Sequence, residues 1–218
     1  MPRHRINGAK REAATASDIA VLRQALRSVA PLSSEDLAQL PAHMRVNLPR
    51  GAAFLRAGDR AKEVGLVVAG ALREFFVLSD GSERTKGFNL PGDFAGSLSD
   101  LLLEGPARTW VVAEVPTVVL VTAWSSYRAL VESRPGWTRF AREIAERLYR
   151  SKVQREYELL ALDAAARYKL ALERWPALES TFTQRDIASY IGITPVHLSR
   201  LRAAAGKAKP SSRSRRAR

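Results

Sequence analysis

The segment from Met44 to Val121 constrains the fold most, because it alternates short apolar runs with turn signals. The apolar runs are VGLVVAG, REFFVL, WVVAEV and TVVLVT. The turn signals are Pro49-Arg50-Gly51, Ala57-Gly58-Asp59, Ser79-Asp80-Gly81 and Pro91-Gly92-Asp93. Asp80-Gly81, between REFFVLS and SERTKGF, predicts a two-residue hairpin turn. Many short strands without alternating helices predict an antiparallel, jelly-roll-like β roll over residues 44–122, within an α+β fold.

Helical patterns flank this region. Residues 1–16 are polar, basic and aperiodic, and we expect them to be disordered. Ser17 is expected to cap a helix that begins a domain of residues 17–134. The apolar face of that helix is Ile19, Leu22, Leu26 and Val29.

A long stretch from Trp137 to Leu162 contains no Gly or Pro and predicts one helix over residues 135–162. One apolar stripe consists of Trp137, Ala141, Ile144 and Leu148. Its continuation, shifted by one position, is a second stripe of Ala145, Tyr149, Val153 and Leu160. A helix of this length most simply buries its stripe against a second copy of itself, which predicts a homodimer. The alternative is a helix that lies across its own barrel.

Composition narrows the classes of protein. Apolar residues make up 46% of the 218 and charged residues 26%, as in ordinary globular chains. No apolar run approaches the roughly 20 residues that cross a bilayer, and the N-terminus has no apolar signal region, so we expect a cytoplasmic protein without a membrane partner. The sequence has no cysteine, which excludes thiolate nucleophiles and iron–sulfur clusters. Its three histidines, His4, His43 and His197, are too far apart in sequence to suggest a metal site.

The charge points to an anionic partner. Lys and Arg number 35 against 22 Asp and Glu, a formal net charge of +13. Six basic residues and no acidic one lie between Lys207 and Arg218, which leaves +7 on residues 1–206. Such a balance favours nucleic acid as the partner, ahead of an anionic membrane surface.

The segment Gln184 to Leu201, QRDIASYIGITPVHLSRL, predicts a helix-turn-helix. Ile187, Ala188 and Ile191 share one helical face, and Gly192 permits the left-handed backbone of a tight turn. Thr194 can cap the second helix with Pro195 at its first position, and Leu198 and Leu201 return that helix to the core. The arrangement places a second helix in the major groove of double-stranded DNA, whereas the alternative is an ordinary helical hairpin in a bundle.

Polar and exposed positions of this segment are the candidate DNA contacts. They are Thr183, Gln184, Arg185, Thr194, Pro195, Val196, His197, Ser199 and Arg200. Arg200 is the best candidate for bidentate contact with guanine, with a phosphate contact as the alternative. Val196 offers only apolar contact, and Thr183, Gln184 and Arg185 at the start of the first helix are natural phosphate ligands.

A β roll, a long helix and a C-terminal helix-turn-helix together resemble the Crp/Fnr superfamily of bacterial transcription regulators over about residues 32–202. The resemblance rests on Gly51, Gly58-Asp59, Gly70, Asp80-Gly81, PGDFAG (91–96), Arg108-Thr109, Asp163 and TPVHLSR (194–200). It implies a homodimer through the long helix, twofold symmetric DNA sites and a cyclic-nucleotide-binding-like sensor domain at residues 17–134. RNA polymerase is then a further candidate partner.

The resemblance also implies an effector pocket, in which this chain departs from the family. The corresponding residues are Gly96, Ser97, Leu98, Arg108 and Thr109. Members that bind cyclic nucleotides have a ribose-binding glutamate where this chain has Ser97, which disfavours cyclic AMP or cyclic GMP and leaves another ligand or none. The Arg108 side chain could grip a phosphate or, alternatively, form an ion pair with Asp93 or Asp100. No cofactor is assigned, and the missing cysteines exclude the iron–sulfur cluster of the family's other branch.

These observations predict a homodimeric, sequence-specific regulator with a helix-turn-helix domain at residues 163–205 and a basic tail at 206–218. PVHLSR replaces the family's usual PETLSR, so the usual half-site is not assumed. The alternative is an architectural protein that binds DNA mainly through charge, without effector control. An enzyme of cupin type is disfavoured because no histidine lies between Met44 and Val121, and we assign no catalytic residue.

Overall fold

The computed structural model describes residues 9–207, and side chains as far as Ala204. The chain divides into two compact units, Met1–Tyr157 and Glu158–Arg218. The expected disordered N-terminus and basic tail lie partly outside the described residues, at 1–8 and 208–218. Within the described range, no helix is both long and apolar enough to cross a membrane.

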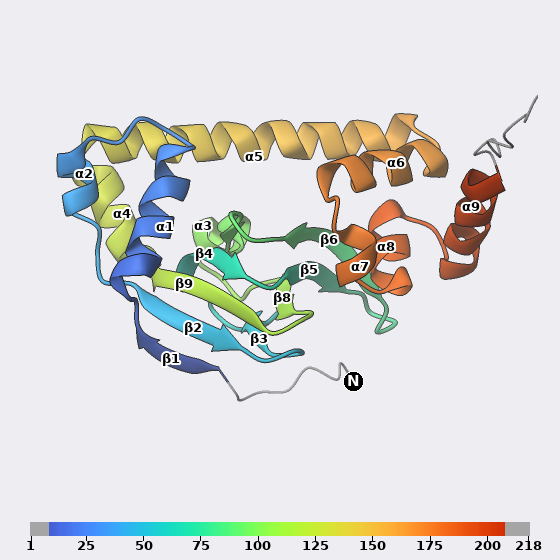
Figure 1. The fold of residues 1–218 in the computed structure, drawn as a ribbon, viewed down its shortest axis with the longest axis horizontal. Coiled ribbons are helices and arrows are strands. Elements are labelled where there is room, and N and C mark those ends of the chain that lie inside the picture. The colour runs from blue at the N-terminus through green and yellow to red at the C-terminus, as the bar shows by residue number, and fades with distance from the viewer. Residues whose placement is uncertain (1–8, 208–218) are drawn as a thin grey trace, which may run out of the picture. The chain divides into compact units, whose positions relative to one another are not determined.

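Two antiparallel sheets form the roll of the first unit (Figure 1). The larger sheet has the order β1 (Lys10–Ala13), β2 (Met44–Leu48), β9 (Thr117–Ala123), β4 (Glu63–Ala69) and β7 (Phe94–Ala95). The smaller sheet has the order β3 (Ala53–Leu55), β8 (Trp110–Ala113), β5 (Leu72–Val77) and β6 (Glu83–Asn89). The predicted antiparallel roll is therefore confirmed.

Alternation along the strands builds two cores. Val119 and Val121 of β9 point between the sheets, where they pack with residues such as Leu72 and Val111 of the smaller sheet. Leu120, between them in sequence, points to the other face. Successive side chains of a strand face opposite sides, so one strand serves both cores.

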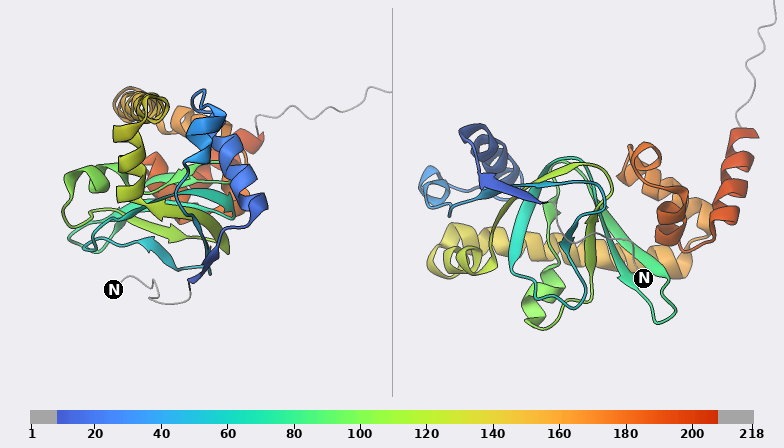
Figure 2. Two further views of the ribbon diagram at one scale, coloured as in Figure 1. Left: turned by 90° about the vertical axis from the view of Figure 1, so that its left-hand side faces the viewer. Right: turned by 90° about the horizontal axis from the view of Figure 1, so that it is seen from below.

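Helices cover the outer face of the larger sheet (Figure 2). They are α1 (Ala16–Arg27), α2 (Ser34–Ala38), α4 (Trp124–Ser133) and the start of α5 (Pro135–Ala161). Leu22 and Leu26 of α1 pack there with Trp137 and Phe140 of α5. The indole of Trp137 also donates to the Asp36 carbonyl at 3.1 Å, which joins α5 to α2.

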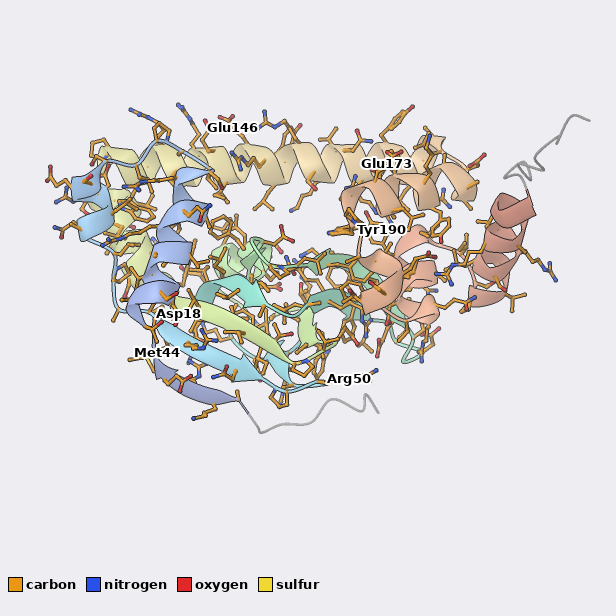
Figure 3. The ribbon with its side chains drawn as sticks, in the orientation of Figure 1. Asp18, Met44, Arg50, Glu146, Glu173 and Tyr190 are labelled. Atoms are coloured by element: carbon orange, nitrogen blue, oxygen red, sulfur yellow. The ribbon has the colours of Figure 1, made fainter. Side chains whose placement is uncertain are left out.

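The N-terminal expectation is wrong for residues 10–16. Lys10–Ala13 form β1, which pairs antiparallel with β2. The helix starts two residues earlier than expected, because Thr15 rather than Ser17 is its N-cap and forms a capping box with Asp18. The buried Asp18 carboxylate also accepts from Arg45 of β2 (Figure 3). Backbone pairing and these polar contacts place a segment whose only apolar side chains are those of alanine.

The β5–β6 hairpin forms where expected, but with a longer turn. Leu78 and Ser82 close it, since the Leu78 amide donates to the Ser82 carbonyl at 2.9 Å. Three residues, Ser79, Asp80 and Gly81, therefore form the turn rather than two. Gly81 has a φ of +79°, the left-handed position that such a loop requires.

The two apolar stripes of α5 have different environments. Trp137 is fully buried and Ile144 partly buried against the domain's own core. From Ala145 onward the helix is mostly exposed, including Tyr149 at 69% and Leu160 at 80%. The start of the first stripe thus follows the expectation of a helix packed on its own domain, whereas Leu148 at its end is 41% exposed. The second stripe has no such cover among the described residues.

The second unit consists of the end of α5 and four helices. They are α6 (Ala164–Arg174), α7 (Leu178–Thr181), α8 (Gln184–Ile191) and α9 (Pro195–Lys207). Asp163 caps α6 by accepting from the Ala166 amide at 2.8 Å. The division between the units falls at Tyr157, inside the long helix, and α9 runs two residues past the expected end of the domain at 205.

Candidate nucleic-acid interface and effector cradle

Helices α8 and α9 meet at a tight turn that the sequence dictates. Gly192 ends α8 with a φ of +82°, and its amide donates to the Ala188 carbonyl at 2.9 Å. The Ile193 amide donates to the same carbonyl at 3.0 Å. Thr194 then caps α9, because its hydroxyl accepts from the His197 amide at 3.2 Å. The predicted Gly turn and Thr cap are both present.

Buried side chains hold the two helices together. Ile187, Ala188, Ile191 and Leu198 are all fully buried. Ala188 lies where the helices cross, and its small side chain allows their close approach. The side-chain amide of Gln184, at the start of α8, also donates to the Pro195 carbonyl at 2.7 Å. The start of α9 is therefore fixed against the start of α8.

Most of the predicted DNA contacts lie around one surface pocket. It is lined by Thr183, Gln184, Arg185, Pro195, Val196, Ser199 and Arg200. Thr194 and His197 are exposed but do not line it. The exposed tip of α9 includes Val196, whose side chain is 62% exposed. The starts of two helices thus bring seven of the nine candidates to one surface.

The arginines of this unit fall into two groups. Arg202 forms an ion pair with Glu179 at 2.7 Å and donates to the Tyr168 hydroxyl at 3.1 Å. Arg185 and Arg200 are exposed, and neither has a hydrogen bond or ion pair within residues 9–207. Guanidinium groups without an internal partner can contact phosphate or guanine without first breaking a bond.

Arg202 is a residue that the sequence reasoning missed. Its ion pair and hydrogen bond attach the middle of α9 to α6 and α7, and so help to fix the orientation of the helix that carries Arg200. Contact with Glu179 and burial together raise the pKa of Tyr168. The spacing between Tyr168, Glu179 and Arg202 gives no signal in one sequence, because three helices must be packed before these groups meet.

A buried carboxylate at the end of α5 and an arginine at the end of α6 support the same unit. Glu158 is only 1% exposed and accepts from Arg174 at 2.6 Å. Arg174 also donates to the Tyr190 hydroxyl at 2.6 Å (Figure 3). This network links α5, α6 and α8 within the unit.

The expected effector residues meet in the roll, at the start of α3 (Leu98–Leu103) and the start of β8. Ser97 and Thr109 are each 1% exposed, and their hydroxyl oxygens lie 3.2 Å apart. Gly96 has a φ of +126°, and a Cβ there would lie 3.2 Å from the Glu63 carbonyl oxygen. The Arg108 side chain points to solvent. We call Ser97, Asp100, Thr109 and the backbone amide of Arg108 the cradle.

Asp100 occupies the centre of the cradle. Its carboxylate accepts from the backbone amides of Arg108 at 3.2 Å and Thr109 at 3.3 Å. Burial raises the pKa of Asp100, but hydrogen bonds from the hydroxyls of Ser97 and Thr109 and from the two amides outweigh it, so the net shift is downward. The expected ion pair between the Arg108 side chain and Asp100 is therefore wrong. Arg108 does contact Asp100, but through its backbone amide. Asp93 instead accepts from the Leu90 amide at 2.8 Å.

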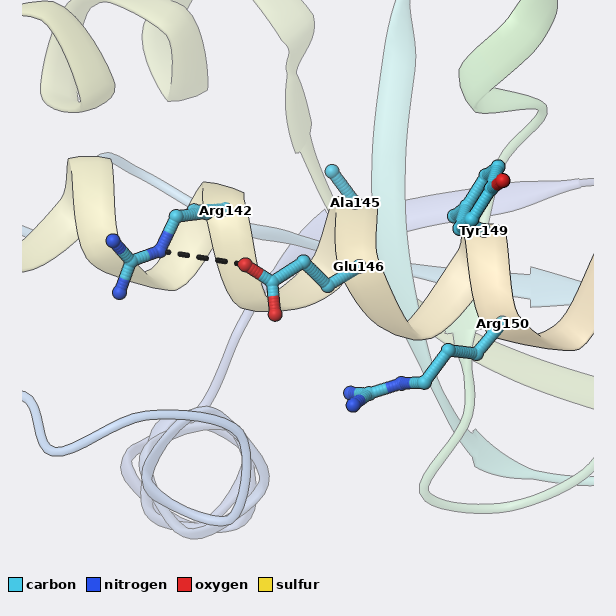
Figure 4. A pocket seen from close by; sticks show the side chains of 5 residues that line it. All are labelled: Arg142, Ala145, Glu146, Tyr149 and Arg150. Atoms are coloured by element: carbon cyan, nitrogen blue, oxygen red, sulfur yellow. Dashed lines mark ion pairs between the residues drawn. The ribbon is translucent and has the colours of Figure 1, made fainter.

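The long helix carries a further surface, at Arg142, Ala145, Glu146, Tyr149 and Arg150 (Figure 4). An ion pair of 3.6 Å joins Arg142 and Glu146 along one side of the helix. Ala145 and Tyr149 belong to the second apolar stripe. Charged side chains thus border exposed apolar ones on the same face.

Comparisons with known proteins agree with this architecture. The family model of the cyclic nucleotide-binding domain matches residues 45–134. The fumarate and nitrate reduction regulatory protein of Yersinia pestis is 25% identical over 165 residues, which are 71% of this chain and 65% of that protein. The chain thus spans slightly less than two thirds of that relative's length.

Solved structures show the same fold. FixK2 from Bradyrhizobium japonicum superposes with a TM-score of 0.66 at 24% identity, over 76% of this chain and 85% of that one. CLP of Xanthomonas campestris, described as a c-di-GMP responsive global regulator, gives 0.59 at 14% identity, over 87% and 92%.

The fold and the family match define a cyclic nucleotide-binding domain followed by a helix-turn-helix unit. The resemblance to the Crp/Fnr superfamily that the sequence predicted is confirmed.

Proposed function

We propose that this chain is a homodimeric, sequence-specific DNA-binding transcription regulator whose roll has a divergent effector cradle. The observation that carries the proposal is the surface around the starts of α8 and α9. Seven residues chosen from the sequence as DNA contacts line one pocket there. The second helix of a helix-turn-helix reads base edges from its N-terminal part, and Val196, Ser199 and Arg200 lie in that part of α9.

The second apolar stripe of α5 supports self-association. Tyr149 and Val153 are 69% and 46% exposed on a helix whose neighbouring residues are also exposed. Burying such a stripe against a second copy removes apolar surface from water. A dimer would also present two reading helices to the two halves of a symmetric site.

Selection of bound duplexes from a random pool tests the function. Purified full-length protein is used at about 50 mM and about 150 mM salt, since phosphate contacts weaken steeply over this range. We expect enrichment of a twofold motif with half-sites about one helical turn apart at both salts. Binding without an enriched motif, lost at the higher salt, would favour the architectural alternative that the charge of +13 allows.

A pair of α5 variants tests the dimer. Val153→Asp adds a charge to the exposed apolar stripe, whereas Ser151→Asp adds the same charge to another side of the helix. Sedimentation velocity should show a dimer for the wild type and Ser151→Asp, and a monomer for Val153→Asp. Selection with Val153→Asp should then recover at most half-sites. A wild-type monomer, or a dimer that both variants keep, would contradict the proposed interface.

A further inference from the structure

The cradle has the groups that a phosphate would need, but they are already used. Two adjacent backbone amides, of Arg108 and Thr109, point at the same place, and the hydroxyls of Ser97 and Thr109 lie beside them. Amides and hydroxyls that converge in this way are a common means of binding an anion. Here the anion is the carboxylate of Asp100, a residue of the same chain.

A cyclic nucleotide does not fit these residues. Its phosphate would have to displace the Asp100 carboxylate from both amides, or else lie beside a second negative charge that is 96% buried, since Asp100 is 4% exposed. The repulsion between two like charges is strong where water is excluded. Ser97, in the place of the family's ribose-binding glutamate, is fully buried, and its hydroxyl lies 3.2 Å from the hydroxyls of both Ser99 and Thr109.

We propose that Asp100 is the residue that sets the specificity of the roll: its carboxylate takes the position of a ligand phosphate, so the wild-type protein does not bind cyclic nucleotides. The carboxylate joins α3 to the start of β8, the two segments that carry the expected effector residues. The roll is then complete without an effector. The inference refines the cradle named in the proposed function and is independent of DNA binding.

The test compares three full-length proteins. Asp100→Ala frees both amides and removes the charge, whereas Asp93→Asn alters another roll carboxylate that accepts a backbone amide outside the cradle. Cyclic AMP, cyclic GMP and inorganic phosphate are added separately, and binding is followed by calorimetry and by the melting temperature. We expect no binding at 1 mM by the wild type or Asp93→Asn, and at least tenfold tighter binding of cyclic nucleotide by Asp100→Ala.

Adding phosphate and the cyclic nucleotides separately distinguishes a general anion site from a nucleotide site. A gain with phosphate as well as with nucleotide identifies a general anion site, and a gain with nucleotide alone identifies a nucleotide site; both support the proposal. Cyclic nucleotide binding by the wild type would overturn it. So would a folded Asp100→Ala, with a wild-type circular dichroism spectrum, that gains no affinity for any of the three.

A second variant covers the case in which Asp100→Ala does not fold. Asp100→Asn keeps the shape and one amide acceptor and removes only the charge, so a smaller gain in affinity is expected, and no gain would overturn the proposal. DNA binding is measured in parallel by fluorescence anisotropy. A wild type that binds no DNA would contradict the proposed function but leave the nucleotide result intact.

Discussion

The cradle in the roll and the surface of the helix-turn-helix use the same kinds of groups in opposite ways. In the cradle, backbone amides and hydroxyls converge on a carboxylate of the chain itself. At the starts of α8 and α9, the side chains of Arg185 and Arg200 are exposed and have no internal partner among the described residues. The first site satisfies its polar groups internally, and the second leaves charged groups available to a ligand.

This difference matters because the free energy of binding depends on what a ligand must displace. A ligand anion that enters the cradle has to displace a buried carboxylate from two backbone amides, and our proposal is that this cost exceeds what the ligand's own hydrogen bonds recover. A phosphate or base at Arg200 displaces only water. Sequence similarity to a ligand-binding family therefore describes the fold of the roll, while the internal hydrogen bonds decide its ligand.

The arginines of the second unit allow the strongest test of this contrast, because Arg174 is used internally and Arg200 is not. Arg174→Ala should remove a guanidinium partner of Glu158, which is 1% exposed. Removing a cation from a buried carboxylate is strongly destabilising. Because Arg174 itself is partly exposed, we expect the free energy of unfolding to fall by about 3 kcal/mol. Chemical denaturation followed by circular dichroism measures it.

Two controls keep this prediction specific. Glu158→Gln in the Arg174→Ala background removes the buried charge and should recover part of the lost stability. Arg185→Ala, at an exposed arginine without an internal partner, should change stability by less than about 0.5 kcal/mol. Equal losses for Arg174→Ala and Arg185→Ala would erase the distinction between the two groups of arginines.

Arg200→Ala should give the reverse pattern. Because the Arg200 side chain has no hydrogen bond or ion pair within residues 9–207, the melting temperature should stay unchanged, while affinity for the selected operator should fall by about 2 kcal/mol, roughly 30-fold. Anisotropy titrations with the operator and with a scrambled duplex measure both affinities. A base contact predicts a large loss for the operator alone. Equal losses for both duplexes would identify Arg200 as a phosphate contact instead.

The roll and the helix-turn-helix were predictable because their signals are local. Short apolar runs separated by turn residues predict strands, and Ile187, Ala188, Gly192 and Leu198 predict two crossing helices from spacing alone. Strand β1 was not predictable, because KREA has no apolar face. Pairing with β2 and the ion pair between Arg11 and Glu63, at 2.6 Å, place it, and both depend on residues far along the chain.

That Asp100 occupies the cradle could not be predicted from the sequence for a related reason. The sequence indicates Ser97 and Arg108-Thr109 by their resemblance to a phosphate-binding motif. It does not indicate that Asp100, eight residues before Arg108, folds back onto the amide of that residue. In the same way, two apolar stripes on α5 are visible in the sequence, but only packing shows that the first meets the domain's own core.

Gly192→Ala tests how the turn between α8 and α9 is held, since the surface around the starts of these helices needs them at a fixed angle. The φ of +82° is strained for any residue with a Cβ, whereas the nearest atom to such a Cβ, in Leu159, is at an ordinary 3.9 Å. We therefore expect a loss of about 1 kcal/mol from backbone strain alone. Gly192→Asn should lose less, because asparagine tolerates the left-handed region better. Equal losses would point to packing instead of φ.

The smallest expected effect is on the free energy of unfolding at acidic pH. It tests whether the group in the cradle is charged. Because the pKa of Asp100 is lowered in the folded state, its carboxylate contributes stability that is present above the unfolded pKa and is lost as pH falls through the lower folded value. Other carboxylates titrate in the same range, so the useful quantity is the difference in free energy of unfolding between the wild type and Asp100→Asn. That difference should shrink as pH falls from about 5 to about 3. A difference that stays constant over this interval would mean that Asp100 is not held as an anion by the amides of Arg108 and Thr109, and the cradle would then lack the charge that keeps a phosphate out.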